Sequence, residues 1–111
     1  MDQTSATEFI KGLGDIREDN ETHERLILFR VGNNDSIFAI IHNGSNPLRL
    51  ETRCDAKLSK VLREKYETVL PSNNMDSSAW NEVICSGQLD EQQVKDLIIL
   101  SYNLTVKLAQ P

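Results

Sequence analysis

Four basic side chains close together in this sequence have the types and spacing of a phosphate-binding surface: Arg49, Arg53, Lys57 and Lys60. Arginine and lysine contact the phosphates of nucleic acids, and such contacts are electrostatic and independent of base sequence. Alternation along residues 48–53 places both arginines on one face of a predicted strand, and the lysines fall on the polar side of the helix that follows. The alternative is an ordinary solvated surface, which charge alone favours.

The distribution of charge supports the first interpretation more than the total does. The chain has 111 residues and a formal charge of −5, from 12 basic and 17 acidic residues. Residues 25–65 hold eight basic and four acidic side chains, a net +4, whereas the segments before and after them carry −5 and −4. An acidic protein therefore contains a basic middle, although the flanking negative potential opposes a polyanion at low salt.

The sequence contains no catalytic or metal-binding motif. No GxSxG, P-loop, GxGxxG or HExxH pattern occurs, and His23 and His42 lie in an acidic stretch and a turn, not at the spacing of zinc ligands. We therefore predict no enzyme activity, no cofactor and no metal. The remaining alternative is a small-molecule site near Met75–Asn81, which requires a concave pocket with convergent polar groups.

Local patterns predict the elements that would position these side chains. Ser5 begins a capping box for a short first helix, and residues 15–25 form an acidic connector. Strands are predicted at 26–31, 37–41, 48–53, 69–71 and 80–85. Asp55 caps a helix through Tyr66 with the apolar stripe Leu58, Val61, Leu62 and Tyr66, and Asp90 with Gln93 opens the last helix. In the strand 48–53, Leu48, Leu50 and Thr52 face one way and Arg49, Glu51 and Arg53 form a charged outer face.

Composition places the protein in a reducing compartment. Two cysteines, Cys54 and Cys85, are too few for a disulfide framework, and the N-terminus lacks the pattern of a signal peptide. The longest apolar runs have five and four residues, whereas a membrane-spanning helix needs about 20. We predict a cytoplasmic, single-domain protein without membrane association, and a monomer.

From Leu28 onward the chain resembles the MmcQ/YjbR family, over about 80 residues in the right order and spacing (28–108). The pattern is specific as a set, although each piece alone is weak. It is carried by Phe29-Arg30-Val31-Gly32, Phe38-Ala39, Arg53-Cys54-Asp55, Leu58, Leu62-Arg63-Glu64-Lys65-Tyr66, Val69, Pro71, Met75, Trp80-Asn81, Val83, Gly87, Leu89, Leu97-Ile98, Ser101-Tyr102, Leu104 and Val106.

The resemblance implies a small α+β domain, a two-layer sandwich of an antiparallel sheet with helices on one face. Its implied order is α-β(3)-α-β(2)-α, similar to secretion-chaperone-like folds. The family is described as DNA-binding through a double wing of β-hairpins. The implied function is therefore a non-enzymatic DNA-binding module with double-stranded DNA as its partner. The alternative is a protein-interaction module of the chaperone-like fold, with a protein partner.

One loop departs from the family pattern. Relatives typically read Pro-Gly-Tyr-His-Met-Asn-Lys-Lys-His-Trp-Asn where this chain has residues 71–81, so the tyrosine, both histidines and both lysines are absent. Asn74, Trp80 and Asn81 are the polar and aromatic candidates for a site in this loop. Trp80 is also the natural core anchor of the region, and Asn81 suits a site or a structural role equally.

Overall fold

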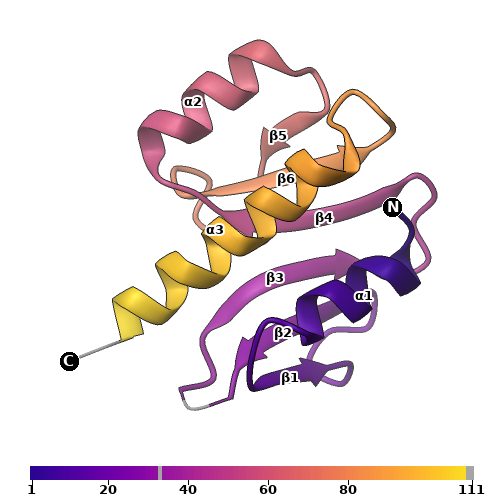
Figure 1. The fold of residues 1–111 in the computed structure, drawn as a ribbon, viewed down its shortest axis with the longest axis vertical. Helices are drawn as coiled ribbons and strands as arrows, with labels where there is room; N and C mark the ends of the chain where they lie inside the picture. Colours follow the sequence, from indigo (N-terminus) through magenta and orange to yellow (C-terminus); the bar gives the residue numbers. More distant parts are fainter. Residues whose placement is uncertain (33, 110–111) are drawn as a thin grey trace.

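A computed structural model describes residues 1–32 and 34–109 and shows a six-stranded sheet with three helices (Figure 1). The spatial order of the strands is β1-β2-β3-β4-β6-β5, and every neighbouring pair is antiparallel. The α+β fold class predicted from the sequence is confirmed. In chain order the elements are α1 (Gln3–Lys11), β1 (Ile16–Asp19), β2 (Leu26–Val31), β3 (Ile37–His42), β4 (Leu48–Arg53), α2 (Ala56–Lys65), β5 (Val69–Pro71), β6 (Trp80–Cys85) and α3 (Glu91–Ala109).

The strand β1 corrects the prediction of an acidic connector over residues 15–25. It pairs with β2 at the edge of the sheet, so the order becomes α-β(4)-α-β(2)-α. Ile16 packs against the core, and the Asp19 carboxylate accepts hydrogen bonds from the backbone N–H groups of Glu21 and Thr22. Pairing with β2 and this Asp-centred turn hold a strand whose own sequence is mostly charged.

The helices begin at side-chain caps, as the sequence predicts for two of the three. Asp55 caps α2, and Asp90 and Gln93 form the reciprocal capping box of α3. The cap of α1 is a correction, because Asp2 takes that role and Ser5 is its partner three residues later. An aspartate three residues before a serine satisfies the same free N–H groups one turn earlier.

The main core lies between the sheet and the helices α1 and α3, which cross the same face of the sheet (Figure 1). Ser101 of α3 ties this layer together, because its hydroxyl accepts from the Arg53 N–H at 2.8 Å and donates to the Phe38 carbonyl at 2.5 Å. Val61 does not belong to the core, since 55% of it is exposed. The buried apolar residues of this core include Ala6, Ile10, Phe29, Phe38, Ala39, Ile41, Leu48, Leu50, Val69, Val83, Leu89, Val94 and Ile98.

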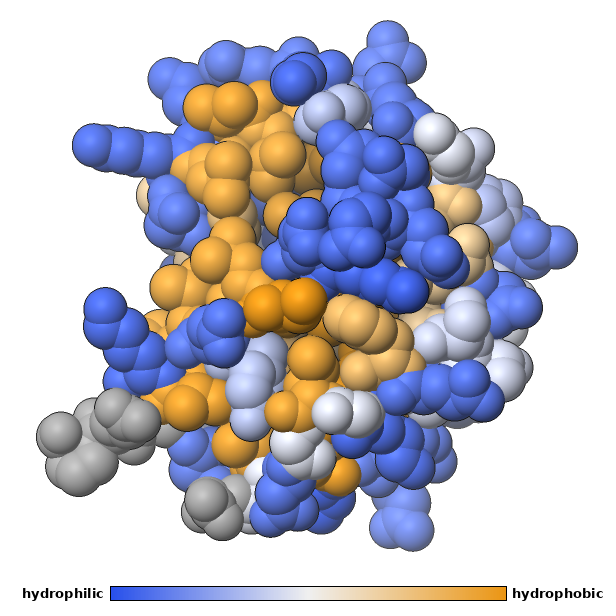
Figure 2. Space-filling model, in the orientation of Figure 1, coloured by the Kyte–Doolittle hydropathy of each residue, from blue (hydrophilic) through white to orange (hydrophobic). Residues whose placement is uncertain are grey.

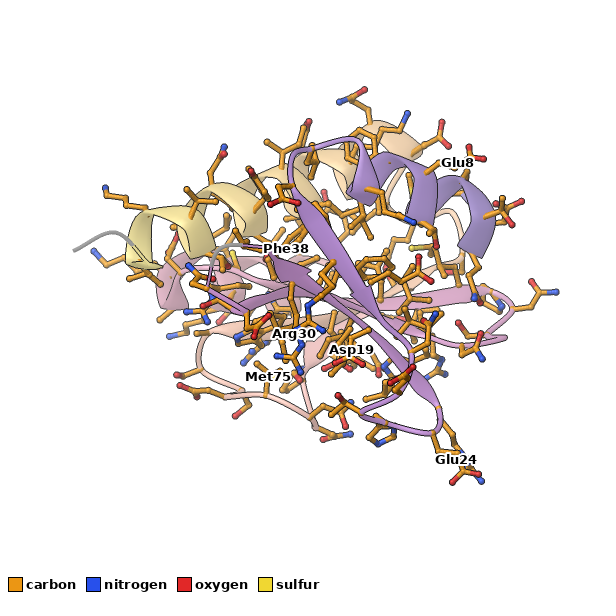
Figure 3. The ribbon with its side chains drawn as sticks, turned by 90° about the horizontal axis from the view of Figure 1, so that it is seen from below. Glu8, Asp19, Glu24, Arg30, Phe38 and Met75 are labelled. Atoms are coloured by element: carbon orange, nitrogen blue, oxygen red, sulfur yellow. The ribbon has the colours of Figure 1, made fainter. Side chains whose placement is uncertain are left out.

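Part of the opposite face of the sheet is covered by the segment 72–79, which we call the cover segment. Met75 of this segment packs on a small apolar cluster made of Leu26, Leu28, Ile40 and Trp80. In Figure 3, Met75, Asp19 and Arg30 lie on this side of the sheet, away from α1 and α3. The charged outer face predicted for β4 is therefore only partly solvated, and Glu51 is fully buried there.

No helix within the described part of the chain is both long and apolar enough to cross a membrane.

Candidate functional site

The four basic residues predicted as a site lie at two places. Arg49 and Arg53 are on the face of β4 that carries the cover segment, and Lys57 and Lys60 are on α2. Arg49 is engaged, because its guanidinium pairs with the Glu82 carboxylate at 3.2 Å. Among the described residues, Arg49 thus differs from the other three in having an ion-pair partner.

Arg53 is held over an aromatic ring beside the start of α2. Its guanidinium carbon lies 5.4 Å from the centre of the Trp80 ring, which sits opposite it on β6. Its buried Nε has no hydrogen-bond partner among the described residues. Stacking on tryptophan orients a guanidinium while leaving its in-plane N–H groups available.

Lys57 and Lys60 follow Arg53 directly in the chain. Both are exposed, and within the described ranges no carboxylate lies within 4.0 Å of either ammonium group. They are three residues apart on α2, so they share one side of the helix. Asp55, two residues before Lys57, caps the Leu58 N–H at 2.9 Å, and Glu64 follows Lys60 by four residues on α2 without reaching ion-pair distance.

Two of the loop candidates have structural roles. Trp80 is 2% exposed and belongs to the apolar cluster, which fits the core-anchor interpretation. Asn81 is 2% exposed, donates to Ser59 and accepts from Arg63 Nε at 2.7 Å. Arg63 also donates to the backbone carbonyls of Ser77 and Trp80, so it fastens the cover segment to α2.

Asn74 leads to a cluster that sequence reasoning missed. Its amide donates to Glu51 Oε2 at 2.7 Å, and the Ser72 hydroxyl donates to the other oxygen of the same carboxylate. His42 Nε2 lies 2.8 Å from Glu51 Oε2 and 3.2 Å from Glu82 Oε1. We call His42, Glu51 and Glu82 the His–Glu–Glu cluster.

Only the register of the sheet brings this cluster together. Glu51 and Glu82 are directly opposite each other on β4 and β6, and His42 ends the strand on the other side of β4. The alternation of β4 did signal that Glu51 shares a face with Arg49 and Arg53. That signal could not show which strands flank β4, nor that the cover segment closes over this face.

A cavity of about 180 Å³ shares Asn74 with the surroundings of the cluster. Asn74 lines it while also contacting Glu51, and Met75 closes part of its wall. Most of its lining residues are apolar, and the three polar ones, Thr22, His23 and Asn74, are exposed. The full lining is Thr22, His23, Leu26, Leu28, Ile37, Ile40, Asn74 and Met75.

The pKa values of the Asp76 carboxyl and of the two cysteine thiols differ from their ordinary values. The backbone N–H and hydroxyl of Ser78 donate to Asp76 and lower the pKa of its carboxyl, and the positive charge of Arg53 acts in the same direction. Burial raises the pKa of Cys85 to about 11 and raises the pKa of Cys54 as well. Both thiols are free, and neither has the lowered pKa of a reactive cysteine.

Comparison with known proteins places the chain in a family. The YjbR family model matches residues 12–104. Proteins named "Uncharacterized protein YjbR" from Escherichia coli K12 and O157:H7 are 27% identical over 74 residues, which are 67% of this chain. The match spans 63% of those relatives, less than two thirds of their length.

Solved structures share the fold. A Deinococcus radiodurans protein with a DUF419 domain superposes with a TM-score of 0.91 at 20% identity, covering 97% of this chain and 80% of that one. A Pseudomonas syringae crystal structure gives a TM-score of 0.81 at 22% identity, covering 95% of this chain and 99% of that one. At these identities the likeness concerns the fold alone.

Proposed function

The chain belongs to the YjbR family, and we propose that it is a non-enzymatic module that binds double-stranded DNA weakly through Arg53, Lys57 and Lys60. The observation that carries this proposal is that these three cations follow one another in the chain where β4 ends and α2 begins. Arg53 is oriented by Trp80, and the two lysines project from the first turns of the helix without an ion-pair partner among the described residues.

The proposed contact is to the phosphate backbone. Lysine ammonium groups and a guanidinium with free N–H groups bind phosphate oxygens without reading bases. Arg49, paired with Glu82, has a smaller part in the contact than the sequence suggests. With few cations and a chain charge of −5, we expect affinity in the range of non-specific binding, about 10⁻⁶–10⁻⁴ M at physiological salt.

Fluorescence anisotropy with a short labelled duplex, over a salt series from about 50 to about 200 mM, tests the proposal. Each phosphate contact contributes about −0.9 to the slope of log K against log salt, so three contacts give about −2.7. The double variant Lys57→Gln/Lys60→Gln is expected to reduce the slope to about −0.9 and to weaken binding equally for unrelated sequences.

The matched control is Lys11→Gln/Lys107→Gln, which removes the same charge at exposed positions elsewhere on the surface. It is expected to keep the wild-type slope. Absence of binding at high micromolar protein, or a control that weakens binding as much as the α2 variant, would reject DNA binding through this surface.

A second candidate function is protein interaction, favoured by apolar side chains that remain exposed on the helical side. Val61 is 55% exposed and Leu108 67%, and Figure 2 shows apolar surface over α2 and along α3. A cavity of about 160 Å³ between these helices holds Leu62 and Leu97 in its wall. Because every copy presents the same apolar face, the first occupant to test is a second copy of the chain.

Sedimentation over a concentration series separates this candidate from the monomer that the sequence predicts. Self-association that Val61→Lys abolishes would support docking through the helical side. A monomer at every concentration, together with salt-dependent binding to DNA, would favour the first proposal. A cytoplasmic location belongs to both proposals and is supported by two unpaired thiols.

A further inference from the structure

We propose that His42, Glu51 and Glu82 bind a divalent first-row transition-metal ion, with Zn²⁺ as the representative ion. The cluster lies on the face of the sheet under the cover segment and is separate from the Arg53–Lys57–Lys60 surface. One donor atom from each side chain lies within 4.8 Å of the other two. The proposal stands or falls independently of DNA binding.

The rigid frame of the sheet places the three donors. Glu51 is on β4, between His42 on one neighbouring strand and Glu82 on the other. Glu51 and Glu82 are exact partners in the β4–β6 register, so their side chains leave the same face side by side. Donors on three hydrogen-bonded strands are held more firmly than donors on a loop.

The cluster places two carboxylates close together, with Arg49 as the only lysine or arginine of the described residues within ion-pair distance. The Glu51 side chain has no exposed surface and that of Glu82 is 12% exposed, so two carboxylates meet in a desolvated place. Like charges directly opposite each other in a sheet destabilise it, and buried charges require compensation. Arg49 reaches only Glu82, and no arginine or lysine of the described chain pairs with Glu51.

One imidazole cannot satisfy both carboxylates. The same atom, His42 Nε2, stands 2.8 Å from Glu51 and 3.2 Å from Glu82, and it carries at most one hydrogen. A divalent cation at the point where the three donors converge would compensate both acids and accept the imidazole lone pair. Bonds of about 2.0–2.2 Å place neighbouring donors roughly 3–3.5 Å apart, compared with 2.8 and 3.2 Å from His42 Nε2 to the two carboxylates and at most 4.8 Å between any two of the three donors.

The donor set selects the class of ion. One imidazole nitrogen and two carboxylate oxygens suit Zn²⁺ and its first-row neighbours better than Mg²⁺ or Ca²⁺, which prefer oxygen ligands alone. Three protein ligands leave a coordination position free. Asn74 both donates to Glu51 and lines the 180 Å³ cavity, so one residue connects the cluster with the cavity.

The cluster also has supporting hydrogen bonds of the kind that orient metal ligands. Ser72 and Asn74 each donate to Glu51 and hold its carboxylate in place, and Arg49 does the same for Glu82. Outer partners of this kind fix the orientation of ligands and tune their affinity for metal. His42 is a quarter exposed, which leaves a route for an ion from solvent.

The test is calorimetric titration of Zn²⁺ into the chelator-treated full chain at neutral pH, with no DNA present. We expect one Zn²⁺ per chain and a rise in melting temperature, since an ion that binds only the folded state stabilises it. NMR of the imidazole rings reports the ligand directly, because Zn²⁺ should shift the resonances of His42 and leave those of His23 unchanged.

Ligand variants and matched controls complete the test. Glu51→Gln keeps the size of the side chain and His42→Gln removes the nitrogen donor, and each is expected to weaken Zn²⁺ binding by at least about 10–100-fold. Glu82→Gln, at a less buried ligand, serves if Glu51→Gln does not fold. The controls His23→Gln and Glu24→Gln change exposed groups of the same types and should bind as the wild type does.

Two outcomes would overturn the proposal. One is Zn²⁺ binding by the wild type no tighter than by His42→Gln, with both proteins folded. The other is one-to-one binding that His23→Gln abolishes, which would place the ion at His23 and not at the cluster. Either result would leave the His–Glu–Glu cluster as a hydrogen-bonded structural network without a metal.

Discussion

Arg63 belongs to the basic segment 25–65, but its side chain has a structural role. It lies on α2, the helix that also carries Lys57 and Lys60. In the structure its guanidinium donates to Asn81 and to the backbone carbonyls of Ser77 and Trp80, where the cover segment leads into β6. A guanidinium that satisfies three acceptors at once is poorly replaced by any other side chain.

We predict that Arg63→Gln lowers the free energy of unfolding by about 2–4 kcal/mol, because several charge-assisted hydrogen bonds are lost and buried acceptors are left without donors. Urea denaturation measures the loss, and hydrogen exchange should quicken at residues 72–79. Lys60→Gln, on the exposed side of the same helix, is the control and should change stability by less than about 0.5 kcal/mol.

The thiols provide a second test on single side chains. A pKa of about 11 for Cys85, in place of 9.0, lowers its thiolate fraction about 100-fold at pH 8. Burial acts in the same direction on Cys54. We expect slow reaction of both thiols with a disulfide reagent in the native protein and fast reaction in denaturant. Rapid native-state labelling of either thiol would contradict this.

Among the helices and strands, α3 is attached to the sheet at a point where the sheet opens. The pairing of β3 with β4 includes Ala39 and Thr52. At the next position along the two strands, the Ser101 hydroxyl accepts a hydrogen bond from the Arg53 N–H and donates one to the Phe38 carbonyl. A small hydroxyl residue therefore replaces a rung of the ladder and fixes the position of the helix over the two strands.

We predict that Ser101→Ala lowers the free energy of unfolding by about 1–3 kcal/mol, since one buried donor and one buried acceptor lose their partner. Chemical denaturation measures the change. Ser86→Ala, at an exposed position outside the helices and strands, is the control and should be nearly neutral. A neutral Ser101→Ala would mean that water or a shift of α3 satisfies both groups.

Local signals were enough for most of these elements but not for their contacts. The caps at Asp55 and Asp90 and the apolar strand 26–31 are encoded by neighbours in the sequence, and the structure confirms them. The strand β1 has no such signal, because three of its four residues are charged. Its pairing with β2 stabilises it instead. The His–Glu–Glu cluster could not be predicted because its three residues meet only through the strand order.

For the molecule as a whole, carboxylates with lowered pKa values are spread over distant parts of the fold. Asp2 is held by Ser5 at the start of α1, Asp19 mainly by Thr22 beside β2, and Asp76 by Ser78 in the cover segment. In each case hydrogen bonds to the ionised form lower the pKa. Their contributions to stability therefore share one dependence on pH.

We predict that the protein loses stability as the pH falls below about 4. A carboxyl whose folded pKa lies below its unfolded value of about 3.9 stabilises the fold above that value, and this contribution is lost as the pH falls toward the folded pKa. Asp19→Asn should therefore differ most from wild type near pH 7 and converge with it in acid. Urea denaturation at several pH values measures this, and a constant difference would contradict it.

The two outer strands of the sheet have a further consequence. β1 has four residues, with charged Arg17 and Glu18 at its centre, and β5 has three and ends in Pro71. Short, charged or proline-bearing edges offer few free backbone groups to another molecule. Both edges of the six-stranded sheet therefore disfavour pairing with a strand of another molecule, the step that leads to fibrils, whatever ligand the faces of the sheet bind.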